Sequence, residues 1–430
     1  MANSRTIRVD VLTRVEGEGA LNIRLRGETV EDVQLQIYEP PRLFEALLRG
    51  RPLEDVPDIT ARICGICPVA YQMSSVHALE ATLGVQITPE IRRLRRLLYC
   101  GEWIESHALH IHLLNAPDFL GYESGLEMAA DFPQEVQRGL RLKKHGNQLL
   151  EALGGRAIHP INVAVGGFYR APKREELAAL VPDFEWGLAA AADVARWVAR
   201  FEFPEFTRPY DMVALVHPEE YPFNEGHITS TNGLSLPVAE FEQHYEEFQV
   251  PHSTALQSQT VRGASYFVGP LARINLNRDR LSPTALQVAD EIGFEIPSTN
   301  PYQSIVARAL EVVQAYEEAL AILKDYRPFR PARIAYGYRA GAGCAATEAP
   351  RGLIYHRYEV DAAGKVVSAK IVPPTSQNQR QMEDDLRSIL PGILHETDER
   401  VAQLCEQYVR NYDPCISCST HFLKVRREQV

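Results

Sequence analysis

The feature that most limits how this chain can fold is a pair of short cysteine motifs near its two ends. RICGIC occupies residues 62–67 and DPCISC occupies residues 413–418, and each supplies two thiols in a C-x-x-C spacing. Such a motif at the start of a helix lets two sulfurs face one ion and helps keep them ionised. If both pairs serve one site, residues near 65 and near 416 must touch. The two ends are then interwoven, and a division into separate domains is not expected.

Composition favours metal or redox roles for the paired cysteines. Seven cysteines, an odd number, argue against a disulfide scaffold in a large chain. The N-terminus MANSRTIRVDV lacks the apolar core of a signal peptide, and no segment approaches the roughly 18–20 apolar residues of a transmembrane helix. We therefore expect a cytoplasmic protein with reduced thiols, in which Cys100 and Cys405 are buried helix residues. The formal net charge of -11 makes nucleic acid or an anionic membrane a poor partner.

Hydrophobic periodicity predicts a mainly helical α+β chain with smaller β pieces. Residues 6–39 alternate apolar and polar positions between glycine breaks, which predicts a β meander. Residues 353–372 predict a β hairpin with its turn near 362–364, and the basic run IRRLRRLL at 91–98 predicts the solvated face of a helix. Helices are predicted at 42–50, at 70–84 with Gly84 as the end, at 89–115 with Pro117 as the stop, and at 178–203, 303–325, 379–389 and 397–411.

Spacing alone leaves three interpretations of the cysteine pairs open. The first is a structural zinc site, although such sites usually draw their pairs from closer positions in the sequence. The second is two unrelated pairs. The third is a special thiolate site for a soft metal such as zinc, nickel, iron or copper(I).

The context of the two pairs resembles the large, catalytic subunit of [NiFe] hydrogenases. The family motif RxCGxC stands at 62–67 and DPCxxCxxH at 413–421, and the resemblance spans nearly the whole chain. It is closest to the cytoplasmic, NAD(P)-linked group that includes the archaeal sulfhydrogenases. It implies one interwoven domain over 1–430, with a central bundle of long helices and small peripheral β-sheets. Further matching stretches are TRVEGEG at 13–19, GGRAIHPINVAVGG at 154–167, EAPRGLIYH at 348–356 and VPPTSQNQ at 372–379.

The resemblance implies a nickel–iron centre on the four cysteines. Cys64 and Cys415 match the terminal nickel ligands, and Cys67 and Cys418 match the thiolates that also bridge to iron. In the family, iron carries one CO and two cyanides.

The resemblance also implies a magnesium or other divalent ion near the C-terminus. Its ligands match Glu45, His421 and the backbone carbonyl near Gln379. Carboxylate and carbonyl oxygens suit a hard ion, whereas histidine is a less usual choice.

The implied reaction is the reversible heterolytic cleavage of H₂, which requires a base beside a nickel thiolate. Either a terminal cysteine sulfur such as Cys415 takes the proton first or a nearby side chain does. Glu16 of RVEG matches the family's proton-relay glutamate, and its alternative is a surface carboxylate. Arg351 matches the arginine over the open site, either as a base or as an electrostatic partner of the cyanides. Residues that match the surrounding shell are Pro350, Asp118 and Asp413.

One position departs from the family pattern. Many members carry a histidine four residues after the first cysteine pair, where this chain has Tyr71, whose hydroxyl is able to donate to sulfur. The motif SHALHIH is a tempting ligand cluster, but only His107 and His110 share a helical face. We expect these residues and His112 to pack or to form hydrogen bonds.

Electrons must leave through partner subunits, because the chain has no Rossmann fingerprint and no cysteines to spare for iron–sulfur clusters. The resemblance implies an iron–sulfur small subunit, a flavin- and NAD(P)-binding diaphorase and further iron–sulfur subunits. It also implies nickel chaperones and a maturation endopeptidase, which in the family usually removes an extension such as FLKVRREQV at 422–430. Two rivals are the homologous respiratory complex I subunit, which lost its cysteines, and a zinc-stapled scaffold.

Overall fold

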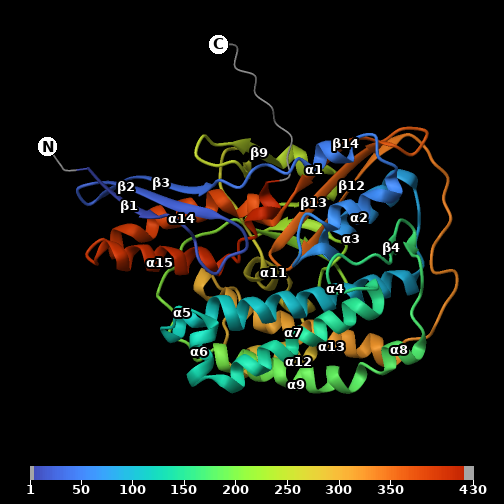
Figure 1. The fold of residues 1–430 in the computed structure, drawn as a ribbon, viewed down its shortest axis with the longest axis horizontal. Coiled ribbons are helices and arrows are strands. Elements are labelled where there is room, and N and C mark those ends of the chain that lie inside the picture. The colour runs from blue at the N-terminus through green and yellow to red at the C-terminus, as the bar shows by residue number, and fades with distance from the viewer. Residues whose placement is uncertain (1–3, 421–430) are drawn as a thin grey trace, which may run out of the picture.

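The computed structural model describes residues 4–420 and separates long helices from small sheets. The long bundle helices pack in one half of the molecule, and the sheets lie in the other half with α14 (Pro374–Ile393) and α15 (Asp398–Asn411) beside them (Figure 1). Five sheets of two to four strands occur within the described residues. The predicted α+β class with a long-helix bundle and small sheets is confirmed.

Two three-stranded sheets come from the two ends of the chain. The N-terminal sheet is the predicted meander, and it orders β1, β2 and β3 antiparallel. The C-terminal sheet contains the predicted hairpin, whose turn uses Gly364 at φ +76°, a conformation that glycine adopts without strain. A further strand on its other side was not predicted. The strands are β1 Ser4–Val9, β2 Gly19–Arg26, β3 Thr29–Ile37, β12 Gly341–Ala349, β13 Gly352–Val360 and β14 Val366–Val372.

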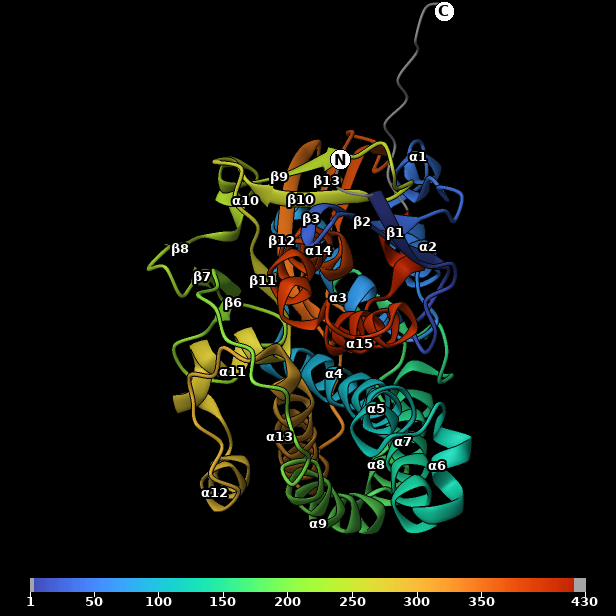
Figure 2. The same cartoon turned by 90° about the vertical axis from the view of Figure 1, so that its left-hand side faces the viewer.

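Four long helices form the bundle, and α4 lies at its centre. It packs on α7 and on α13, and α13 packs on α9 (Figure 2). The sequence predictions include three of the four but not α7, although its buried positions, such as Val136, Leu142 and Leu149, recur at helical spacing. The bundle helices are α4 Pro89–Leu109, α7 Pro133–Gly154, α9 Val181–Val198 and α13 Ser304–Asp325.

Pro117 does not stop the long helix that contains the SHALHIH motif. After α4 the chain forms a π-helical turn, His110–Asn115, and then α5, Ala116–Leu120. Pro117 lies in the first turn of α5, where a proline is tolerated. The helix ends instead at Gly121, which has φ +80°.

The prediction of a solvated basic face at the start of α4 is wrong for two of its arginines. Arg95 is fully buried and donates to Glu80 at 2.5 and 2.8 Å. Arg96 is 4% exposed and pairs with Glu318. Because these acids lie far away in sequence or on another helix, helical spacing alone does not reveal them.

The helices nearest to the cysteine motifs follow the predictions with shifted ends. The first pair precedes α3, Pro68–Leu83, which ends at Gly84 with φ +68° as predicted. The last helix, α15, runs from Asp398 to Asn411 and leads into the second pair. The helix expected at 379–389 is longer, because α14, Pro374–Ile393, already begins inside the VPPTSQNQ motif with a proline in its first turn.

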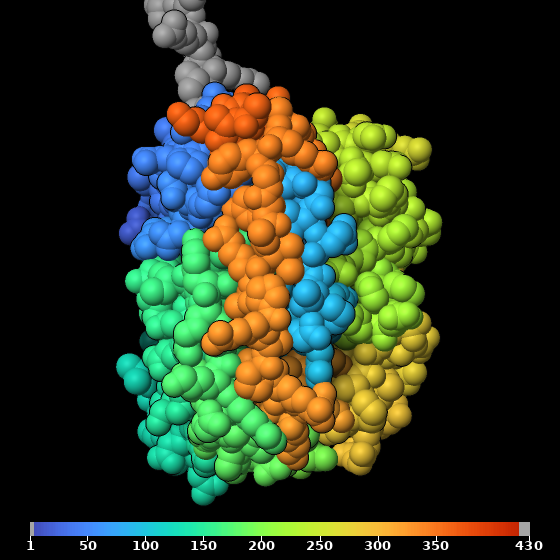
Figure 3. Space-filling model, turned by 90° about the vertical axis from the view of Figure 1, so that its right-hand side faces the viewer, coloured from blue at the N-terminus to red at the C-terminus, as the bar shows by residue number. Residues whose placement is uncertain are grey.

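An extended segment, 326–340, crosses the surface from the helical half to the C-terminal sheet. Figure 3 shows it in orange, as a band that runs along this face between a green and a blue part of the chain. Ile334 N donates to Gly166 O at 2.9 Å, and Arg339 donates to Thr82 O at 2.7 Å, so hydrogen bonds hold it in place. Among residues 4–420, no helix combines the length and apolar character needed to cross a bilayer.

Shorter elements connect these parts. The helices are α1 Phe44–Leu48, α2 Val56–Ala61, α6 Gly125–Asp131, α8 Arg174–Ala178, α10 Phe241–His244, α11 Pro270–Asn277 and α12 Pro283–Glu291. The strands are β4 Val163–Ala164, β5 Gly167–Phe168, β6 Met212–Val216, β7 His227–Ser230, β8 Ser235–Leu236, β9 Tyr245–Gln249, β10 Leu256–Thr260 and β11 Phe267–Val268.

Candidate metal centre

The structure brings the two cysteine pairs together in one buried cluster. Cys64 and Cys67 lie in the turn before α3, and Cys415 and Cys418 lie in the turn after α15. All four side chains are at most 3% exposed. Their sulfur atoms lie within 4.8 Å of one another. Four sulfurs at this spacing form a donor set that one or two soft metal ions can occupy.

Each sulfur of the second motif lies near the other one and near one sulfur of the first motif. The sulfurs of Cys415 and Cys418 are 2.8 Å apart, those of Cys64 and Cys415 are 3.4 Å apart, and those of Cys67 and Cys418 are 3.9 Å apart. The backbone N–H groups of Ile66 and Cys67 both point at the Cys64 sulfur at 3.3 Å. These N–H groups favour a thiolate at Cys64.

The four thiols cannot all ionise without a cation among them. The hydrogen bond from Cys415 lowers the pKa of Cys64 well below its usual range. Burial raises the pKa values of Cys415 and Cys418. Because a metal cation takes the place of the remaining protons, the cluster fits a nickel–iron pair, and on chemistry alone it also fits zinc.

Glu16 connects the start of the chain to the second cysteine pair. The Cys415 thiol donates to Glu16 Oε2 at 3.0 Å, and Ser417 N donates to the same oxygen at 3.1 Å. Ile416 N donates to the backbone oxygen of Glu16 at 2.8 Å. The next residue, Gly17, has φ +88°, and a Cβ there would lie 2.8 Å from Ile416 Cβ. The glycine therefore permits the close approach that holds the carboxylate against the sulfur.

Arg351 lies in the turn between β12 and β13 and binds Asp413 at two points. Its Nε donates to Asp413 O at 2.7 Å, and its Nη2 donates to Asp413 Oδ1 at 3.1 Å. Arg351 Nη1 is buried without a hydrogen-bond partner among residues 4–420. Asp413 itself has φ +52°, an unusual conformation for a residue other than glycine. The two residues form a buried ion pair beside the thiols.

Pro350 is fixed by a buried arginine that the sequence interpretation missed. Arg273 on α11 donates to Pro350 O at 2.9 Å and to Ala349 O at 2.8 Å. Its charge is balanced by Glu311 and Glu348, and all three side chains are fully buried. This network positions the turn that carries Arg351. Because its members are far apart in sequence, no local pattern indicates it.

Asp118 lies further from the four cysteines than Asp413 does. It accepts from Arg14 at 2.5 Å and from Arg410 at 2.8 Å. Arg14 belongs to the segment before Glu16, and Arg410 lies in the last turn of α15. Asp118 therefore ties together the two segments that carry Glu16 and Asp413.

Tyr71 on α3 lies near the thiols of the cluster. The side chain is 1% exposed, and burial together with the nearby Cys418 and Cys67 raises its pKa. The hydroxyl finds no hydrogen-bond partner in the described part of the chain.

The residues predicted for a second metal ion are only partly described. Glu45 on α1 accepts from the backbone N–H of Ile371 on β14 at 2.8 Å. Gln379 lies in α14, and its buried side-chain amide has no partner among residues 4–420. His421 lies outside the described residues, as does the extension 422–430.

The histidines of the SHALHIH motif form hydrogen bonds, as expected. His107 binds Glu311 at 3.0 Å, His110 binds Arg410 O at 2.8 Å, and His112 binds Ala108 O at 2.9 Å. Burial lowers the pKa values of His107 and His112 to about 4.

Two buried carboxyls near the first cysteine pair escaped the sequence interpretation. Glu102 on α4 accepts from the N–H groups of Val69 and Ala70 at 2.6 and 3.0 Å, which caps the first turn of α3. Glu105, one turn further, pairs with Lys143 at 2.5 Å. Burial raises the pKa of Glu102 well above its usual range and that of Glu105 to about 7. The only sequence signal for Glu102 and Glu105 is that they are glutamates among the apolar positions of a predicted helix.

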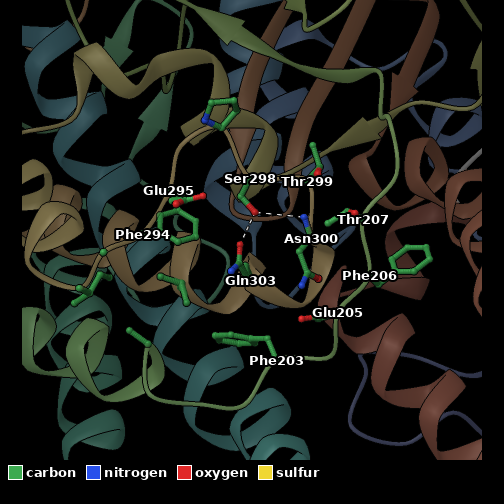
Figure 4. Close-up of a pocket in the computed structure, with 15 residues that line it drawn as sticks. Phe203, Glu205, Phe206, Thr207, Phe294, Glu295, Ser298, Thr299, Asn300 and Gln303 are labelled. Atoms are coloured by element: carbon green, nitrogen blue, oxygen red, sulfur yellow. Dashed lines mark hydrogen bonds between the residues drawn. The ribbon is translucent and has the colours of Figure 1, made fainter.

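A large hollow lies elsewhere on the molecule. It measures about 830 Å³ and is formed by the segments after α9 and α12 and by the start of α13. Phe203, Phe294, Asn300 and Gln303 face into it (Figure 4). Its lining includes none of the predicted site residues. The hollow is therefore separate from the thiol cluster.

Comparison with known proteins decides the family. The model of the nickel-dependent hydrogenase family matches residues 42–138. The alpha subunit of sulfhydrogenase 1 from Pyrococcus furiosus is 34% identical over 424 residues, which cover 97% of this chain and 98% of that one. The chain belongs to the nickel-dependent hydrogenases. It is similar to their large, catalytic subunits, so the enzyme is an oxidoreductase that acts on H₂.

Two further proteins are similar to this hydrogenase chain over nearly its whole length. The NAD-reducing hydrogenase HoxS subunit beta from Cupriavidus necator is 27% identical over 470 residues and covers 98% of the chain and 95% of that relative. A solved NAD⁺-reducing [NiFe]-hydrogenase in the H₂-reduced state matches with a TM-score of 0.89 at 27% identity, covering 98% of this chain and 100% of that one. The fold of the hydrogenase large subunit therefore extends over nearly the whole chain.

Proposed function

We propose that the four-thiol cluster is the place where this hydrogenase subunit cleaves H₂ reversibly, H₂ ⇌ 2H⁺ + 2e⁻. The observation that carries the proposal is the contact of Glu16 with Cys415, because it puts a carboxylate on one sulfur of the cluster. A nickel–iron centre bound there supplies the electrophile that polarises H₂. Cys64 and Cys415 would hold the nickel, and Cys67 and Cys418 would be shared by nickel and iron. The iron would carry CO and two cyanides.

The protein supplies the base for the proton. The Cys415 sulfur receives it first, and Glu16 takes it onward across a distance of 3.0 Å. The carboxylate is partly exposed, so the proton can pass from it toward solvent. General acid–base catalysis of this kind accelerates a reaction by about 10²–10⁴-fold.

Glu16 comes from the N-terminal part of the chain, whereas Arg351 comes from the C-terminal part and also faces the cluster. Its two hydrogen bonds to Asp413 fix the guanidinium, and its free Nη1 is available to a group bound at the cluster. A fixed cation in a buried site stabilises developing negative charge. Three further residues surround the Arg351–Asp413 ion pair and the thiols and help to position them. They are Pro350, Asp118 and Tyr71.

A second ion, magnesium or another divalent cation, binds near the start of α1. Glu45 supplies a carboxylate, the backbone near Gln379 supplies a carbonyl, and His421 supplies the third protein ligand. An ion held in this way would tie the end of the chain to α1 and to the C-terminal sheet.

Electrons leave through an iron–sulfur small subunit that docks beside the first cysteine pair. Three exposed apolar residues, Ile158, Ile161 and Tyr169, are 58%, 53% and 60% exposed and lie in or beside the GGRAIHPINVAVGG motif. Ile161 and Tyr169 line a shallow hollow together with Arg62 of RICGIC. Clustered exposed apolar residues rimmed by charges are typical of protein interfaces. This surface includes Arg62 of the RICGIC motif, which also contains Cys64 and Cys67, so it lies near the thiols that would release the electrons.

From that subunit the electrons pass to NAD(P) through a flavin- and NAD(P)-binding diaphorase and further iron–sulfur subunits, by analogy with the NAD-reducing relatives. The complex works in the cytoplasm. Nickel chaperones load the metal, and an endopeptidase then removes residues 422–430.

Co-purification from the native cell tests the partner interface. Changing Ile161→Asp or Tyr169→Glu should release the small subunit and abolish electron transfer to NAD(P), while H₂-dependent D/H exchange at the loaded large subunit persists. The matched control is Leu126→Asp, because Leu126 is 87% exposed on α6 at a different place. Retention of the small subunit by both interface variants would overturn the proposed docking face.

A further inference from the structure

A basic hollow lies on the surface where the extended segment 326–340 passes the loop between β5 and α8. It measures about 720 Å³ and is lined by residues 169–175 and 328–332. Its lining contains one acidic side chain, Glu175, and four cationic ones. The cationic residues are Arg170, Lys173, Arg174 and Arg330. Because the whole chain carries a formal net charge of -11, this local excess of positive charge is unusual and indicates a ligand of opposite charge.

Three of the four cations form no ion pair within the described part of the chain. Arg170 is the exception, because the carboxylate of Glu176 lies 2.9 Å from its guanidinium and neutralises it. The other three, Lys173, Arg174 and Arg330, are exposed in the hollow. They outnumber the single acid of the lining, so the hollow keeps a positive charge that a bound anion would balance.

Two loops hold the cations around the hollow, and hydrogen bonds join these loops to each other. The Tyr326 hydroxyl donates to Pro172 O at 2.7 Å, and Phe168 N donates to Ala332 O at 2.9 Å. The loops lie side by side in Figure 3, one in green and one in orange. Three prolines of the lining restrict the backbone further, namely Pro172, Pro328 and Pro331. Because the loops are fixed before a ligand arrives, binding costs less conformational entropy.

The lining fits phosphate groups better than single carboxylates. A phosphate group offers several oxygens and up to two negative charges, so it can accept hydrogen bonds from more than one cation at once. Arg174 and Arg330 bring planar guanidinium donors, and Lys173 adds a point charge. The volume falls in the range of about 300–1,000 Å³ that is usual for small-molecule sites. Tyr169, which is 60% exposed, adds an aromatic ring on which a base can stack.

We propose that the basic hollow binds a small molecule through its phosphate groups, with Lys173, Arg174 and Arg330 as their partners. A nucleoside diphosphate has the chemistry that uses both the cations and the ring of Tyr169. The inference goes beyond the proposed function and does not depend on it, because none of these residues holds a metal there. Tyr169 also lines the hollow at the proposed docking face, so the ligand would lie at the edge of that interface.

Protection of Lys173 from acetylation tests the proposal at the hollow itself. The complete purified complex is acetylated in the presence of rising ADP or pyrophosphate, and mass spectrometry measures the modification of Lys173. We expect both anions to protect Lys173, whereas Lys144, an exposed lysine on α7, should react equally at every concentration. Arg174→Gln and Arg330→Gln should each raise the concentration for half protection about tenfold, because each loses a hydrogen bond to a charged group. Arg262→Gln is the matched control, since Arg262 is exposed just after β10.

The two anions and the control variant separate this site from other causes of protection. Tighter protection by ADP than by pyrophosphate supports contact of the base with Tyr169, and equal protection supports a site for the phosphate groups alone. No protection, an unreactive Lys173 in the complex, or equal weakening by Arg262→Gln overturns the proposal. Loss of the small subunit from Arg330→Gln with unchanged protection also overturns it, because the hollow would then bind an acidic segment of that partner.

Discussion

The thiol of Cys415 lies 3.0 Å from Glu16 Oε2, although 399 positions separate the two residues in sequence. The contact is held by a backbone bridge between the same residues and by Ile416 N, which donates to Glu16 O. The carboxylate thus has a fixed place on the sulfur that is proposed to take the proton.

Replacing Glu16 should block proton transfer without removing the metals. We expect Glu16→Gln to lower H₂ oxidation by about 10²–10⁴-fold, because the amide cannot accept the proton. The assay is H₂-dependent dye reduction, with nickel content measured beside it. Glu18→Gln is the matched control, since Glu18 is exposed two residues away. Full turnover by Glu16→Gln would remove Glu16 from the proton path.

Each cluster cysteine should be needed for metal, and the other buried cysteines should not. We expect Cys418→Ser to lose most of its nickel, because the remaining three sulfurs no longer complete the set. Cys405→Ala should keep its nickel, since Cys405 is also buried but lies in α15 outside the cluster. Elemental analysis of the purified proteins gives the answer. Normal nickel in Cys418→Ser would contradict the ligand assignment.

Arg351 should depend on its planar, two-point geometry as well as on its charge. Lysine is a point charge and cannot reproduce both hydrogen bonds to Asp413. We therefore expect Arg351→Lys to keep its nickel and to turn over H₂ several-fold more slowly. Steady-state rates across H₂ concentrations measure this. Parent-like rates would show that charge alone suffices.

Glu105 should make stability depend on pH. Its pKa is raised by burial from 4.5 to about 7 in the folded chain, so the folded state binds more protons than the unfolded state between these values. The contribution of Glu105 to stability is then fully present below pH 4.5 and is lost as the pH rises to about 7, by roughly 3 kcal/mol. Glu105→Gln removes this titration, and its apparent melting temperature should change less between pH 5 and 7 than that of the parent. An identical pH dependence in both proteins would contradict the buried, raised carboxyl.

The sequence predicts the elements that carry local signals. The N-terminal meander, the hairpin around Gly364 and the helix ended by Gly84 have strong alternation, periodicity or a glycine in a left-handed turn. The π-helical turn is different, because it continues the helix up to Pro117 and lets that proline sit in a new first turn. The error at Arg95 arises because this residue meets Glu80 of α3 and the backbone oxygen of Ala164, and no local pattern shows that this face of α4 is covered.

For the site, motif resemblance supplied the residues and the structure supplied the arrangement. The four cysteines, Glu16 and Arg351 stand in recognisable motifs. Glu102 and Arg273 stand in none, because their partners come from other helices and from the turn before β13. Buried charges that balance one another across the fold are visible only once the chain is folded.

The metal content of the active complex as isolated, with an infrared spectrum under H₂, tests whether the four sulfurs hold nickel and iron. We expect nickel near one per large subunit, iron near one beyond the iron of the clusters, and bands of CO and cyanide. Zinc without nickel in an active complex, with no such bands, would contradict it.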